Sequence, residues 1–224
     1  MGSQLNSGRY PALVLQHLSN SVTFKIVHRM ARRVAPNYQL RASLDGIDPP
    51  IWRTFLVPST ATLHEVHRIL QLLFDWYDYH LYRFDFAGRS FEAPDEDAEH
   101  EDATRVRLAD LRFRVGSTLR YTYDYGDNWI HSVTVEDIDA SGDPDWMPWL
   151  LAGERHGPPE DCGGPHRYGE LLLALQKPLE DLEDYDRELV EWLDRDFDPD
   201  EFSVSQARHA LILTAAWGVL RRKR

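Results

Sequence analysis

The strongest constraint on the fold is a predicted β-hairpin formed by residues 117–125 and 129–135. Both runs are rich in aromatic and β-branched residues and alternate between apolar and polar positions, as half-buried strands do. Gly126, Asp127 and Asn128 separate the two runs, and these residue types favour tight turns. The chain is therefore expected to contain an antiparallel sheet.

The register of this hairpin decides which side chains share a face. A three-residue loop pairs Tyr125 with Trp129 and Tyr123 with His131, with Asn128 in the left-handed conformation that asparagine tolerates. One face then carries Tyr121, Tyr123, Tyr125, Trp129, His131 and Val133.

Two interpretations of this aromatic face remain open. In the first, it is a binding platform, or part of a metal site that includes Asp124 or Asp127. In the second, which the sequence favours, it is a packed core in which a hydroxyl or carbonyl group satisfies His131.

The patterns before the hairpin predict an α+β fold with a helix across one face of a mixed sheet. Alternating runs predict strands at 38–44, 51–57 and 79–86. An apolar stripe at helical spacing predicts a helix over 62–75, and Thr62 with Glu65 forms a capping box at its start. A β-grasp-like core is the narrower expectation.

The patterns after the hairpin predict an irregular segment and then a C-terminal helical segment. Residues 139–165 are rich in Gly, Pro and Asp, which favour loops. Helices are expected at about 166–176, 180–194 and 203–218. Ser203 is a suitable N-cap for the last of them.

The overall net charge of -12 conceals an uneven distribution. Residues 1–41 contain six basic and no acidic residues, and residues 221–224 are all basic. The stretch between them holds 15 Lys and Arg against 37 Asp and Glu. We expect this acidic body to repel phosphate backbones, so any direct contact with nucleic acid would come from the ends.

This distribution suggests a division of the chain. Residues 1–36 are expected to form a basic amphipathic extension, residues 37–220 one domain, and residues 221–224 a basic tail. No apolar run is long enough to span a membrane, and no secretory signal is evident. The single cysteine excludes an internal disulfide, so a cytoplasmic setting is expected.

Two further segments concentrate residues that could carry chemistry. Residues 157–164 place Glu160, Asp161 and Cys162 between a Pro-Pro pair and a Gly-Gly pair. The prolines restrict the backbone, and the glycines permit conformations that other residues rarely adopt. Residues 76–82 follow the predicted helix and contain His80.

These segments and the hairpin supply the candidate pocket. Its members are Tyr123, Asp124, Asp127, Trp129, His131, Glu160, Asp161, Cys162 and His80, with His80, Asp127, His131 and Cys162 as metal candidates. No established metal-binding spacing is present, and no phosphate loop or nucleophile-elbow motif occurs. In the pair His64 and His67, the second belongs to the apolar stripe, which favours core packing. Catalytic residues, cofactors and oligomeric state are therefore left open.

Six blocks together resemble the plasmid pRiA4b ORF-3-like family over about residues 38–210. They are PPIWR at 49–53, TLHEVH at 62–67, WYDYHLY at 76–82, YDYGDNWIH at 123–131, PPEDCGG at 158–164 and FDPDEF at 197–202. The family's hairpin more usually has Phe where this chain has Tyr125. The resemblance implies an α+β domain of bacteria and archaea, often encoded on plasmids or beside insertion elements, and it transfers no catalytic residue.

Three functions remain as hypotheses. The first is a binding or accessory domain with a mobile-element context and a protein or small-molecule partner. The second is a metal-dependent hydrolase that uses the His, Asp, Glu and Cys residues named above. The third is a DNA-associated recombination accessory protein that acts through its basic ends.

Overall fold

A computed structural model describes residues 35–94, 99–139, 147–193 and 197–216. The chain divides into two units, residues 1–34 and residues 35–224, and every described residue belongs to the second. The expected basic extension, apart from its last two residues, and the basic tail lie outside the described residues.

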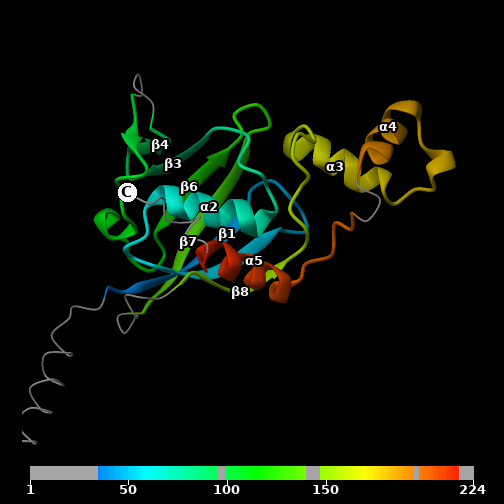
Figure 1. Cartoon of the computed structure of the whole chain (residues 1–224). Helices are drawn as coiled ribbons and strands as arrows, with labels where there is room; N and C mark the ends of the chain where they lie inside the picture. Colours follow the sequence, from blue (N-terminus) through cyan, green and yellow to red (C-terminus); the bar gives the residue numbers. More distant parts are fainter. Residues whose placement is uncertain (1–34, 95–98, 140–146, 194–196, 217–224) are drawn as a thin grey trace, which may run out of the picture. The chain divides into compact units, whose positions relative to one another are not determined.

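A mixed sheet of eight strands forms the centre of the described unit, in the order β5-β4-β3-β6-β7-β1-β2-β8 (Figure 1). The strands are β1 (Asn37–Leu44), β2 (Trp52–Pro58), β3 (Tyr82–Phe86), β4 (Arg89–Glu92), β5 (Glu101–Asp102), β6 (Thr118–Tyr123), β7 (Trp129–Asp139) and β8 (Trp149–Glu154). Neighbours are antiparallel except β4 and β5, which are parallel. The α+β prediction is confirmed, whereas the central β1–β7 pairing is antiparallel and does not match a β-grasp core.

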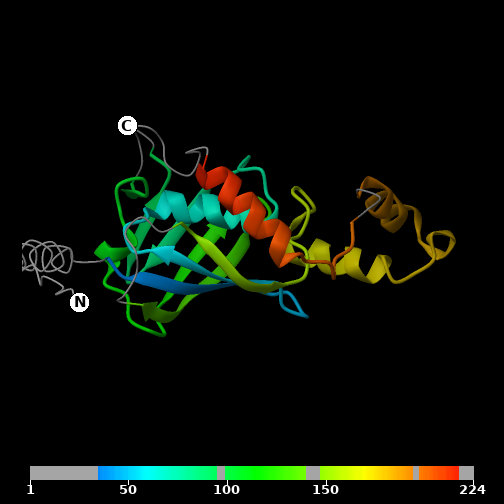
Figure 2. The same cartoon turned by 60° about the horizontal axis from the view of Figure 1, so that its bottom comes forward.

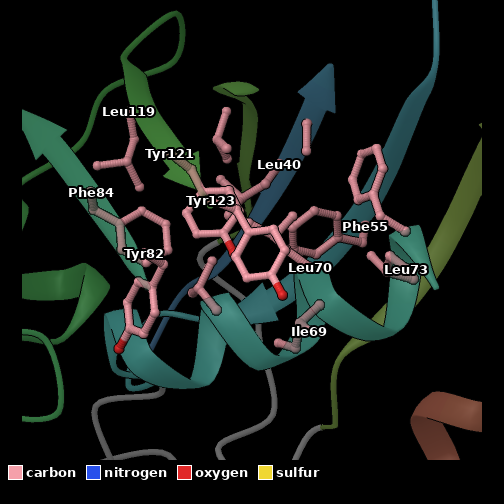
Figure 3. Close-up of a cluster of buried hydrophobic side chains, with 14 of the residues drawn as sticks. Leu40, Phe55, Ile69, Leu70, Leu73, Tyr82, Phe84, Leu119, Tyr121 and Tyr123 are labelled. Atoms are coloured by element: carbon pink, nitrogen blue, oxygen red, sulfur yellow. The ribbon is translucent and has the colours of Figure 1, made fainter. Parts of the chain in front are cut away.

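Helix α2 (Leu63–Phe74) lies across one face of this sheet, as predicted. Thr62 caps it by accepting the N–H of Glu65, and the Glu65 carboxylate accepts the N–H of Thr62 at 2.7 Å. The buried side of α2 packs onto aromatic and aliphatic side chains of the sheet (Figure 3). The labelled members of this core are Leu40, Phe55, Ile69, Leu70, Leu73, Tyr82, Phe84, Leu119, Tyr121 and Tyr123. Burial of such apolar area is the main contribution to folding stability.

The C-terminal helices are α3 (Gly164–Ala174), α4 (Asp184–Trp192) and α5 (Val204–Ala216). Short 3-10 turns, η1 (Leu108–Leu111) and η2 (Leu179–Asp181), complete the described elements. Helices α2 and α5 lie on the same face of the sheet, and α5 also contacts β8 (Figure 2). The hydroxyl of Ser203 accepts the N–H of Gln206 at 3.3 Å, in keeping with its predicted capping role.

Strand β8 corrects the expectation that residues 139–165 are wholly irregular. It pairs with β2 at the sheet edge, with a bulge between Thr54 and Phe55. Local sequence did not indicate this strand, because its Gly and charged neighbours favour loops and the pairing partner lies far away in the chain.

The register of the hairpin also differs from the prediction. Tyr123 pairs with Trp129, and Tyr121 pairs with His131. The loop is longer because Asp124 takes a left-handed conformation (φ 55°) and its carbonyl accepts the N–H of Asn128. Asn128 is left-handed as expected (φ 58°), but Tyr125 leaves the buried face and is exposed.

Among the described residues, no helix combines the length and the apolar character needed to cross a bilayer.

Candidate metal centre

The loop after α2 carries His80 and is held by contacts with a distant loop. The indole N–H of Trp76 donates to the Pro158 carbonyl at 2.8 Å. The backbone N–H of Tyr77 donates to Oε1 of Glu160, also at 2.8 Å. Because Trp76 is buried in the core, it anchors this loop to the domain, and His80 has a defined position near Glu160.

Hydrogen bonds of the buried His67, a residue of helix α2, support the same loop. Nε2 of His67 lies 2.7 Å from Oδ1 of Asp78, and Nδ1 lies 2.8 Å from the hydroxyl of Tyr121. A carboxylate only accepts, so Nε2 of His67 carries the proton and Nδ1 accepts from Tyr121. Burial lowers the pKa of His67, and the hydrogen bond that His67 donates to Asp78 opposes this shift. The predicted packing role of His67 is confirmed, since its side chain is fully buried.

The hairpin loop supplies the second member of the site, Asp124. Its backbone N–H donates to the Leu81 carbonyl at 2.9 Å, and its Oδ1 accepts the N–H of Gly126 at 2.8 Å. These bonds fix the buried carboxylate and turn its other oxygen, Oδ2, towards His80.

The Pro-Pro loop supplies Glu160 and Asp161. Its path is tight, because a Cβ on Gly157 would overlap the backbone carbonyl of Phe74. At its other end the N–H of Gly163 donates to Oδ2 of Asp127 at 2.9 Å. Asp161 itself is left-handed (φ 58°).

The three loops bring an imidazole and three carboxylates together. Nε2 of His80 lies 3.0 Å from Oδ1 of Asp161, 3.7 Å from Oδ2 of Asp124 and 3.7 Å from Oε2 of Glu160. This nitrogen is screened from solvent and makes no hydrogen bond of good geometry with the described residues. Ligand atoms of His80, Asp124 and Asp161 all lie within 4.8 Å of one another.

This donor set suits a divalent transition metal. Imidazole nitrogen with carboxylate oxygen fits ions such as Zn²⁺ and Mn²⁺. Ligand atoms bound to one such ion at about 2.1 Å lie roughly 3 to 4 Å apart, so small side-chain rotations would complete the shell. Asp161 has a side chain that is 64% exposed, which leaves one side of the cluster open.

Tyr123 positions Glu160 at the edge of this cluster. Its hydroxyl donates to Oε1 of Glu160 at 2.9 Å and accepts the N–H of Tyr79 at 3.2 Å. Burial, followed by the Glu160 carboxylate, raises the pKa of Tyr123, so the phenol remains a neutral donor. Oε2 of Glu160 is therefore the oxygen left facing His80.

The remaining candidate residues lie outside the cluster. Asp127 caps the Pro-Pro loop through Gly163, and Trp129 is buried in the core. Cys162 is also buried, and desolvation raises the pKa of its thiol to about 12, which suppresses the thiolate needed for nucleophilic or metal-ligand chemistry. Of the four metal candidates, only His80 belongs to the cluster. The other ligands in the cluster are Asp124 and Asp161, in place of Asp127, His131 and Cys162.

His131 is fully buried in the aromatic core, which is the interpretation that the sequence favours for this face. Its ring lies edge-on to Phe74 at 4.6 Å and to Trp76 at 5.3 Å between centroids. Neither ring nitrogen makes a hydrogen bond of good geometry with the described residues. Desolvation lowers the pKa of His131 to about 3, so the imidazole is neutral at physiological pH.

Two exposed residues beside the cluster were not among the candidates. The rings of Tyr77 and Tyr79 stack with centroids 5.7 Å apart. The only sequence signal for them is their place on either side of Asp78, next to His80.

Three comparisons with known proteins give a family model, a similar protein and a similar solved structure. The family model described as plasmid pRiA4b ORF-3-like protein matches residues 36–206. The uncharacterized protein y4hQ of Sinorhizobium fredii is 35% identical over 190 residues, which cover 82% of this chain and 95% of that protein. The crystal structure of a protein of unknown function from Methanosarcina mazei Go1 superposes with a TM-score of 0.68 at 33% identity, covering 76% of this chain and 97% of that one. Because the family model matches residues 36–206, which are more than half of the chain, this chain belongs to the plasmid pRiA4b ORF-3-like family.

Proposed function

We propose that the domain binds a divalent metal ion through Nε2 of His80, Oδ2 of Asp124 and Oδ1 of Asp161. The observation that carries this proposal is the convergence of these atoms around a screened imidazole nitrogen with no hydrogen bond of good geometry. Three close carboxylates repel one another, and a bound cation would relieve that repulsion.

Metal-dependent hydrolysis is the second candidate function. Catalytic metal sites hold the ion with three protein ligands and keep a position open for water. The exposure of Asp161 supports an open position, and Oε2 of Glu160, 3.7 Å from Nε2 of His80, would be the general base if water were bound there. In the absence of turnover, metal binding would serve a binding or accessory role with a protein or small-molecule partner.

We place the activity in residues 37–220, in the cytoplasm and in the mobile-element context of the family. The excess of acidic residues in this stretch argues against direct binding of a nucleic-acid backbone by the domain. The DNA-associated alternative therefore depends on the basic ends. Removing residues 1–36 and 221–224 would abolish DNA binding if that alternative held.

Metal titration of protein purified without a histidine tag tests the proposal. Calorimetry with Zn²⁺ and Mn²⁺ should give about one equivalent for the wild type. His80→Ala should weaken binding by at least about tenfold, since even indirect support of a ligand is worth that much. His166→Ala is the matched control, because His166 is an exposed histidine of α3 outside the cluster. Equal affinities for the two variants and the wild type would reject the site.

A further inference from the structure

The loop that carries His80 also presents two exposed aromatic side chains. The side chains of Tyr77 and Tyr79 remain 65% and 74% exposed. Their rings are nearly parallel, at 24°, with centroids 5.7 Å apart. We call this pair the tyrosine platform. Their exposed faces offer apolar area and aromatic rings that a ligand could cover.

The tyrosine platform is built on the same backbone as the metal centre. The N–H of Tyr77 is bound to Oε1 of Glu160, and the N–H of Tyr79 is bound to the hydroxyl of Tyr123. Tyr79 directly precedes His80 in the chain. Because both main-chain donors are fixed, the backbone that carries the two rings is held beside Glu160 and His80, so one small molecule could engage both the rings and the metal.

The chemistry of the two parts defines the ligand. Exposed tyrosine rings stack on nucleobases, and this stacking tolerates any base. The carboxylates of Asp124, Glu160 and Asp161 would repel a phosphate, but a divalent ion held by them would attract it. We propose, building on the metal site proposed above, that the domain binds a nucleotide with its phosphate on the metal and its base on the tyrosine platform.

The charge of the domain favours a mononucleotide over a polynucleotide. Residues 42–220 hold 15 basic against 37 acidic side chains, so each added phosphate of a long strand meets net repulsion. A mononucleotide presents its charge only at the metal. Free mononucleotide should therefore bind more tightly than a short single strand of the same base.

Calorimetric titration of the Mn²⁺-loaded full chain with AMP tests the proposal. Binding should require the metal. Tyr79→Ala should weaken it by about tenfold, whereas Tyr79→Phe should retain it, because stacking depends on the ring. Tyr185→Ala is the control, since Tyr185 is a comparably exposed tyrosine of α4, where it packs on Arg167. Metal affinity should be the same in all three variants.

The outcomes separate the two proposals. A protein that binds Mn²⁺ but not AMP, or binds AMP equally with Tyr79→Ala, would overturn the nucleotide assignment and leave the metal site standing. A protein that binds no metal would overturn both. Tighter binding of a short oligonucleotide than of AMP would overturn the mononucleotide preference.

Discussion

Nε2 of His80 and Oδ1 of Asp161 lie 3.0 Å apart, although strands β3 to β8 separate their two loops in the sequence. The loop of His80 follows α2, and the loop of Asp161 precedes α3. Their contact is possible because Trp76 and Glu160 tie the two loops together. The site is thus a product of loop packing, and changes to that packing should alter it in measurable ways.

Tyr123→Phe should loosen the metal site without unfolding the domain. The variant loses the hydroxyl that donates to Glu160 and accepts from the N–H of Tyr79. The expected cost is about 1 kcal/mol in the free energy of unfolding and about a tenfold loss in metal affinity. Urea denaturation and metal titration measure the two effects, and unchanged metal affinity would argue against this supporting role.

Gly157→Ala should destabilise the domain strongly. The added Cβ would overlap the backbone carbonyl of Phe74, which cannot move without distorting the end of α2. We expect a loss of about 2 kcal/mol or more in the free energy of unfolding. Gly169→Ala is the matched control, since a Cβ there meets nothing within 4 Å in helix α3, and it should be neutral or slightly stabilising. Similar urea midpoints for the two variants would contradict the close packing of the Pro-Pro loop.

His131 should make the domain less stable as the pH falls below about 6.5. Its pKa is lowered to about 3 in the folded state, so the unfolded state binds a proton first. Its contribution is complete above pH 6.5 and is lost between there and pH 3. It amounts to about 2 kcal/mol between pH 6.5 and pH 5.

His131→Phe should reduce this pH dependence, because it removes the titrating group from an aromatic environment that accepts a ring. Part of the slope should remain, since burial also lowers the pKa of His67. Unfolding free energies at pH 7 and pH 5 give the comparison, and an undiminished slope in the variant would show that His131 is not responsible.

Cys162 should be unreactive in the folded protein. Burial and a pKa of about 12 keep its sulfur protonated and covered. Iodoacetamide at pH 8 should label it only slowly in buffer and rapidly in denaturant. Cys162→Ser should retain metal binding. Loss of metal binding in a folded variant would show that Cys162 is part of the site.

The sequence predicted those parts of the fold that depend on local patterns. Helix α2 follows from its apolar stripe and from the capping box at Thr62 and Glu65, which act within a few residues. Strand β8 escaped prediction because its pairing with β2 is a tertiary effect. The hairpin register escaped because the left-handed turn at Asp124 extends a loop that the residue types alone would make shorter.

The sequence identified the residues of the candidate site but not their arrangement in space. His80, Asp124, Glu160 and Asp161 were all among the candidates, because they lie in polar, turn-rich segments. Their spacing in the chain follows no ligand pattern, so only the fold reveals which of them meet. The packing of His131 among aromatic rings follows from the alternating pattern, whereas the geometry of its hydrogen bonds depends on the register of the strands.

A crystal structure of the Zn²⁺-soaked, tag-free protein tests the central claim most directly. The account predicts one anomalous difference peak about 2.0–2.2 Å from Nε2 of His80 and from carboxylate oxygens of Asp124 and Asp161. The peak should disappear in His80→Ala and persist in His166→Ala. An empty cluster at saturating Zn²⁺, or a peak that excludes Nε2 of His80, would contradict the metal site.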